Sequence, residues 1–170
     1  MTSSKSVTGL PGLIEGRIAG RGEFTEVIRQ AFAAAGVEGW REIILSDPDF
    51  DDWPLGERGV TQALNDWSKA GCKLMMMAGS YDTVLGRHAR FAVWRRTWAH
   101  MVECRASVAT PAGRIPSAFW SPSWTFERVD VQRCIGVAGS DVVRRVALKE
   151  RLNEQLLNSS PAFPASVLGL

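Results

Sequence analysis

The chain has 170 residues, of which 45% are hydrophobic and 22% charged, a composition that excludes bulk disorder and fits one globular domain. The formal net charge is +2, and no apolar run reaches the roughly 18 residues that a membrane span requires. Residues 1–12 hold one lysine and no apolar core, so they do not resemble a secretory signal, and we expect a cytoplasmic protein.

The charges are distributed unevenly along the chain. Residues 1–86 carry 8 lysines and arginines against 12 acids, whereas residues 87–170 carry 12 against 6. Arginine supplies 16 of the 20 basic residues, and its planar guanidinium suits two-point contacts with phosphate or carboxylate. Two interpretations follow: either the two halves neutralise each other, or the second half binds an anion.

The first half of the chain alternates between helical and strand patterns. Apolar residues at helical spacing predict a helix over 23–35, and a short apolar run predicts a buried strand over 40–46. Residues 55–70 follow as a second helix and residues 72–78 as a second strand. A strand, a helix and a strand in this order are typical of a parallel βαβ unit.

The second half begins with a predicted helix over 88–100 and a strand over 101–108. Two further strands are expected near 118–127 and 131–137, as an antiparallel hairpin. The pattern over 141–157 predicts a long amphipathic helix.

Together these elements predict an α/β domain over residues 22–157, with a mixed, largely parallel sheet flanked by helices. Residues 1–21, which are rich in glycine, and residues 158–170, which prolines interrupt, are expected to form tails. The last helix of the domain should carry Val142, Val146, Leu152 and Leu156 on or near its buried side.

The most conspicuous polar cluster follows the first strand directly, with acids at Asp47, Asp49 and Asp51. Ligands of open α/β sheets bind at the carboxyl ends of strands, so these three carboxylates are candidate Mg²⁺ ligands. Asp47 and Asp49, together with Ser80 after the second strand, are candidate catalytic residues, and the Asp-x-Asp resembles the first motif of haloacid-dehalogenase-type phosphatases. The alternative is that the acids only cap the turn before the next helix.

A basic and aromatic segment occupies residues 87–105, in which Glu103 is the only acid. Within it, Arg90, Arg95, Arg96 and His100 are candidates for binding an anion, whether phosphate, nucleic acid or a lipid headgroup. Alternatively, the aromatic side chains fill the core and the arginines pair with the acidic loop.

The hairpin before the last helix resembles the phospholipase D superfamily, whose motif is His-x-Lys, four residues, Asp, six residues and Gly-Ser. Gly139 and Ser140 match the Gly-Ser, whereas Thr125, Glu127 and Gln132 stand where the family has its His, Lys and Asp. The resemblance implies a fold like one half-domain of that superfamily, and a homodimer, because single-half members pair with themselves. It also implies that catalysis is lost, because threonine without a base is a poor nucleophile and glutamate repels phosphate.

The chain also resembles a bacterial family of unknown function, through residues 47–58 and 88–100, and this likeness implies no activity. The sequence therefore predicts a phospholipase D-like pseudoenzyme, without a cofactor, that binds an anionic partner or forms part of an assembly. The alternative is an enzyme, a Mg²⁺-dependent phosphohydrolase or phosphotransferase that uses Asp47 and Asp49.

Overall fold

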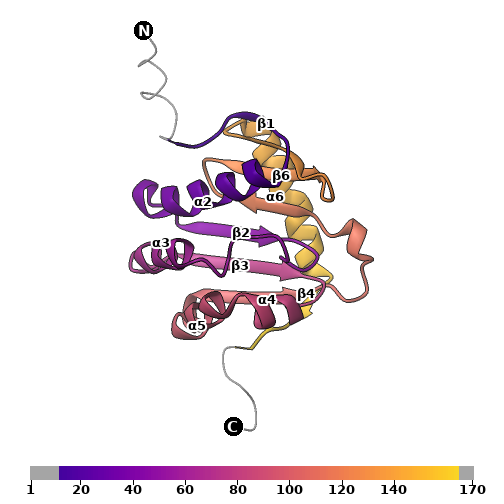
Figure 1. The fold of residues 1–170 in the computed structure, drawn as a ribbon. Helices are drawn as coiled ribbons and strands as arrows, with labels where there is room; N and C mark the ends of the chain where they lie inside the picture. The colour runs from indigo at the N-terminus through magenta and orange to yellow at the C-terminus, as the bar shows by residue number, and fades with distance from the viewer. Residues whose placement is uncertain (1–11, 165–170) are drawn as a thin grey trace.

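The computed structural model describes residues 12–164, which build one mixed sheet in the order β1-β7-β6-β5-β2-β3-β4-β8 (Figure 1). The strands are β1 (Gly16–Ile18), β2 (Glu42–Ser46), β3 (Lys73–Ala78), β4 (Val102–Ala106), β5 (Ser117–Trp120), β6 (Thr125–Asp130), β7 (Ile135–Gly139) and β8 (Ser160–Pro161). The helices are α2 (Arg21–Glu38), α3 (Arg58–Ser68), α4 (Asp82–Arg87), α5 (Ala89–Thr97) and α6 (Val142–Leu157), with 3-10 turns at Ala99–Met101 and Ala112–Arg114.

The expectation of a largely parallel sheet, like that of a phospholipase D-like half-domain, is wrong. The pairs β2–β3 and β3–β4 are parallel, as the predicted βαβ unit requires, but the other five pairs are antiparallel. The strand predicted over 118–127 is in fact two strands, β5 and β6, joined by a turn at residues 121–124. Pro122 cannot continue a strand ladder, and the hydroxyl of Ser121 accepts a hydrogen bond of 3.0 Å from the amide of Trp124, so the chain reverses there.

Helices cover the two faces of the sheet unequally. Figure 1 shows α2, α3 and α5 side by side on one face, whereas α6 crosses the other face. The larger core lies beneath the three helices and is rich in aromatic side chains, such as Phe24 and Phe119, whose exposed fractions are 0%. Burial of this apolar surface provides the main driving force for the fold.

Helix α6 buries only part of the side that its sequence suggested, since Leu152 is buried and Leu156 is half-buried. Leu148 and Leu152, one turn apart, pack on Trp120 and its neighbours in a second, smaller core. Val142 and Val146 lie on another side of the helix and are exposed, so the prediction that they are buried is wrong.

The two expected tails each contribute a short edge strand. β1 pairs antiparallel with β7, and β8 pairs antiparallel with β4. The rest of the tails, residues 1–11 and 165–170, lies outside the described residues. Among the helices of residues 12–164, none is both long enough and apolar enough to cross a membrane.

Candidate anion-binding surface

Helix α5 turns a basic side towards solvent because its aromatic residues hold the opposite side in the core. Phe91 and Trp94 are buried, and the indole nitrogen of Trp94 donates a hydrogen bond of 3.0 Å to the hydroxyl of Ser68 on α3. Helical spacing then places Arg90 and Arg96 on the outer side, where both are exposed. The aromatic residues therefore fill the core, as one alternative stated, yet these two arginines remain at the surface.

Arg87 pairs with Asp51 of the acidic loop, as the alternative expected, but three other exposed basic residues of this region have no acidic partner among residues 12–164. Arg90, Arg96 and His100 form no ion pair within 4.0 Å with a described acid. Arg90 donates a hydrogen bond of 2.9 Å to the carbonyl of Gly56, which directs its side chain without neutralising it. We call Arg90, Arg96 and His100, which lies in the 3-10 turn after the helix, the α5 surface; its two guanidinium groups remain available to an anion.

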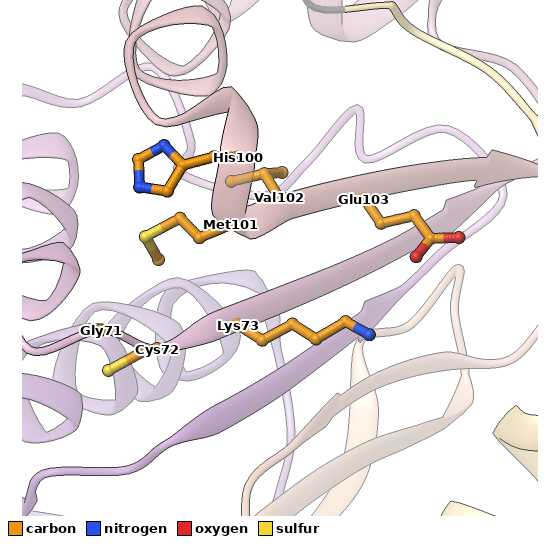
Figure 2. Close-up of a pocket in the computed structure, with 7 residues that line it drawn as sticks. All are labelled: Gly71, Cys72, Lys73, His100, Met101, Val102 and Glu103. Atoms are coloured by element: carbon orange, nitrogen blue, oxygen red, sulfur yellow. The ribbon is translucent and has the colours of Figure 1, made fainter.

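A cavity of about 480 Å³ lies beside His100, where β3 and β4 begin. Lys73, the first residue of β3, also lines it. Figure 2 shows the ammonium group of Lys73 and the carboxylate of Glu103 extending in one direction, while the imidazole of His100 points the other way. The two basic groups therefore do not converge on one point, and the cavity has no compact catalytic arrangement.

Arg95 does not belong to the same surface. Its exposed fraction is 6%, and its Nε donates a hydrogen bond of 3.1 Å to the carbonyl of Phe163 in the C-terminal segment. The guanidinium carbon lies 5.7 Å from the centre of the Phe163 ring, a cation–π contact. The structure thus separates Arg95 from the three other residues with which the sequence grouped it.

The carboxylates proposed to bind Mg²⁺ are each occupied by protein groups. Asp47 accepts hydrogen bonds of 2.8 and 3.2 Å from two backbone amides of its own loop and one of 2.8 Å from Arg128. The carboxylate of Asp49 accepts a hydrogen bond of 3.0 Å from the backbone amide of Asp51, and the carboxylate of Asp51 forms an ion pair with Arg87. Within the described part of the chain, no three His, Cys, Asp or Glu side chains are placed to hold a metal ion. This geometry favours the interpretation of the loop as a capped turn.

The positions that correspond to the phospholipase D motif do not gather around one point. Thr125 is buried at the start of β6, where it pairs in register with Gly139 of β7. Gln132 lies in the turn at the opposite end of the same hairpin and is exposed. The length of the hairpin therefore separates Gln132 from Thr125.

The remaining candidate residues hold elements of the fold together. Glu127 forms a two-point ion pair with Arg151 of α6, with both hydrogen bonds 2.7 Å long. The backbone amide of Ser140 donates a hydrogen bond of 3.1 Å to the carboxylate of Glu15. The hydroxyl of Ser80 accepts a hydrogen bond from the backbone amide of Asp82, the first residue of α4. Each of these contacts accounts for its residue without a ligand.

Sequence reasoning missed a buried charged residue, Arg128, whose exposed fraction is 4%. Its guanidinium pairs with Asp47 over 2.8 Å and with Asp52 over 2.6 Å, lies 4.1 Å from the centre of the Phe24 ring, and donates from Nε to Ser117 over 2.8 Å. Burial acts to lower the pKa of Arg128, but the hydrogen bonds and charges of the two aspartates outweigh it, so the pKa is raised. The burial of Arg128 could have been expected from the sequence, because strand alternation places it on the same face of β6 as Phe126.

Comparison with known proteins identifies the fold but no family. No family model matches the chain, and no curated protein matches it. Among solved structures the chain is similar to TrmBL2, an archaeal chromatin protein whose structure shows a novel mode of DNA binding, with a TM-score of 0.65 and 16% sequence identity. The similarity covers 94% of this chain but 58% of that chain, so this chain spans less than two thirds of that structure. At this identity the likeness is one of fold.

Proposed function

We propose that this domain is a binding module for an anionic partner, and that the phosphate backbone of nucleic acid docks on the α5 surface. The observation that carries the proposal is the exposure of Arg90 and Arg96 without an acidic partner among the described residues. Guanidinium groups bind phosphate oxygens through paired, charge-assisted hydrogen bonds. Residues 89–100 contain no acid that would repel a phosphate.

Two observations favour nucleic acid over a lipid headgroup as the partner. The fold is similar to that of TrmBL2, for which DNA binding is described, although the likeness extends over little more than half of that chain. The outer side of α5 also has a single large apolar side chain, Val93, which is 57% exposed. A helix that lies in a membrane surface needs a broad apolar face, which α5 does not offer.

The size of the surface predicts weak, sequence-independent binding. Helix α5 has nine residues and is therefore about 14 Å long, enough to meet only a few phosphates of a duplex. Each phosphate neutralised by a basic side chain contributes about 0.9 to the slope of log affinity against log salt concentration. Arg90 and Arg96 together should contribute a slope of about 1.8.

The test is fluorescence anisotropy of a short labelled duplex, titrated with the protein between about 50 and 200 mM salt. The variant Arg90→Ala/Arg96→Ala should bind more weakly at low salt, and its salt slope should be smaller by about 1.8. A matched control is Arg114→Ala/Arg144→Ala, which removes the same charge from two other exposed arginines and should retain the slope of the wild type.

The possible outcomes test the docking site and the nature of the partner separately. If the double variant at Arg90 and Arg96 binds with the same salt dependence as the wild type, the nucleic acid docks elsewhere and the α5 surface is not the binding site. If the wild type itself shows no salt-dependent binding, the nucleic-acid partner is wrong. The homodimer expected from the sequence remains a separate prediction, which sedimentation of the protein without nucleic acid would test.

A further inference from the structure

Arg95 lines a cavity of about 380 Å³ at the edge of the sheet, where β8 lies against β4. The walls come from α5, from β4 through Val102, and from the C-terminal segment through Ala162 and Pro164. This volume is near the lower end of the range of about 300–1,000 Å³ that ligand sites occupy. This cavity adjoins the one beside His100, with which it shares Val102 and Glu103, but Arg95 lines only this one.

The guanidinium of Arg95 has more hydrogen-bonding capacity than its surroundings use. An arginine side chain carries five N–H donors. The Nε of Arg95 is bonded to Phe163, but Nη1 is buried and has no hydrogen-bond partner among residues 12–164. No described acid lies within ion-pairing distance of this side chain, which is 6% exposed. A buried cation without a counter-ion is costly, so proteins normally pair such groups with an acid.

The neighbouring Arg105 shows that anchoring the C-terminal segment does not explain this arrangement. Arg105 also holds that segment, with Nε and Nη2 donating over 2.7 Å to the hydroxyl and carbonyl of Ser159. Its Nη1 pairs with Glu103 over 3.1 Å, so each of its three nitrogens has an acceptor. Arg95 holds the C-terminal segment with its Nε alone. Its Nη1 therefore still needs a hydrogen-bond acceptor.

We propose that this cavity binds a small monocarboxylate with a short aliphatic body, whose carboxylate pairs with Arg95. Val102, Ala162 and Pro164 supply apolar walls that suit an aliphatic group. A doubly charged phosphate would lose more hydration than a monocarboxylate on entering a cavity with these apolar walls, so phosphate is disfavoured. A single guanidinium matches the two oxygens of one carboxylate. The C-terminal segment forms one wall of the cavity through Pro161, Ala162 and Pro164.

The test compares isovalerate with its neutral analogue isovaleramide and with inorganic phosphate, using the full chain. Isovalerate at millimolar concentration should raise the melting temperature and give a calorimetric binding isotherm, because a ligand that binds only the folded state stabilises it. The amide has the same shape without the charge, and neither it nor phosphate should have an effect. Arg95→Met should abolish the response to isovalerate, whereas Arg96→Met, on the exposed side of the same helix, should retain it.

A second variant keeps the proposal testable if Arg95→Met does not fold. Ala162→Phe leaves Arg95 in place but fills the cavity from its edge, and it should also abolish the response. The proposal is overturned if isovalerate gives no shift in the wild type, if the amide gives an equal shift, or if either variant retains the response. If Arg95 only holds the fold together, isovalerate and isovaleramide should have the same effect on the melting temperature. The site is independent of the α5 surface, so Arg95→Met should leave the salt-dependent binding of nucleic acid intact.

Discussion

The guanidinium of Arg128 donates a hydrogen bond of 2.8 Å to the carboxylate of Asp47, although the two residues are 81 positions apart. The exposed fractions of the two side chains are 0% and 2%, and Asp52 joins them 2.6 Å from the same guanidinium. Strand β5 lies between β2 and β6 in the sheet, so the pair spans a strand and ties the loop after β2 to β6. The acids that look like metal ligands in the sequence thus include a structural counter-ion.

Replacing Arg128 with methionine should destabilise the fold strongly. The substitution keeps much of the apolar contact but leaves the carboxylates of Asp47 and Asp52 without their buried cation. Removing one member of a buried ion pair costs about 3–5 kcal/mol, which urea denaturation at neutral pH would measure as a lower free energy of unfolding. The control Arg114→Met removes an exposed arginine and should change the free energy by about 0.5 kcal/mol or less. A loss of only about 0–1 kcal/mol for Arg128→Met, typical of exposed pairs, would contradict this account.

Magnesium should leave the stability of the protein unchanged. Asp47 and Asp49 already accept hydrogen bonds from backbone amides, and Asp47 is held by Arg128. Millimolar MgCl₂ should therefore give the same melting temperature as NaCl at equal ionic strength. A rise specific to Mg²⁺ that disappears in Asp49→Asn would instead restore the enzyme alternative, because only a bound metal would link that residue to the stabilisation.

Local patterns allowed most helices and the central strands to be predicted from the sequence. The helices near 23–35 and 141–157 and the strands near 40–46 and 72–78 appear in the structure as α2, α6, β2 and β3. Their periodicities arise within one element, so one sequence suffices. The antiparallel pairing of β5 with β2 could not be read in this way, because it depends on where the chain returns to the sheet.

The candidate site was predicted only in part, for a similar reason. Arg95 lies four residues after Phe91, and this spacing puts both on the same side of a helix, so its burial could have been expected. The network around Arg128 could not, because its partners are 76 and 81 residues away. Contacts at that separation are set by the topology of the sheet, which no local pattern contains.

The thiol of Cys104 should make stability depend on pH in the alkaline range. Burial raises the pKa of Cys104 to about 11 in the folded protein. Below the pKa of an unfolded cysteine, about 8.5, both states hold the proton and no effect is expected. Above it the unfolded state loses its proton first, so stability falls as the pH rises towards the folded pKa. Between about pH 8 and pH 10 the loss due to this group should be about 1–2 kcal/mol.

The variant Cys104→Ala separates this contribution from other alkaline effects. Burial also raises the pKa of Tyr81, so part of the pH dependence should persist in the variant. Urea denaturation of both proteins at the two pH values gives the difference that belongs to the thiol. Equal pH-dependent losses in the wild type and the variant would show that the Cys104 thiol does not titrate differently in the folded and unfolded states.

Gly136 on β7 should not tolerate a side chain. A Cβ at this position would lie 2.5 Å from the backbone oxygen of Glu127 and 2.7 Å from the ring of Phe126, closer than such atoms approach. One contact is with backbone, so β6 and β7 must separate, and Gly136→Ala should lower the free energy of unfolding by about 1–3 kcal/mol. Gly113→Ala is the matched control, because a Cβ there meets nothing within 4 Å, and it should be nearly neutral.

Gly136 also pairs in register with Arg128 on β6, so the alanine should disturb the buried ion pair as well. Residues that share a contact network have non-additive effects. The double variant Gly136→Ala/Arg128→Met should therefore lose less stability than the sum of its single variants, because the displaced strand has already weakened the pair. Denaturation of the four proteins in one double-mutant cycle measures the coupling. Strict additivity would show that β6 absorbs the extra methyl group without moving Arg128, and that the cluster is less dependent on the β6–β7 register than its geometry indicates.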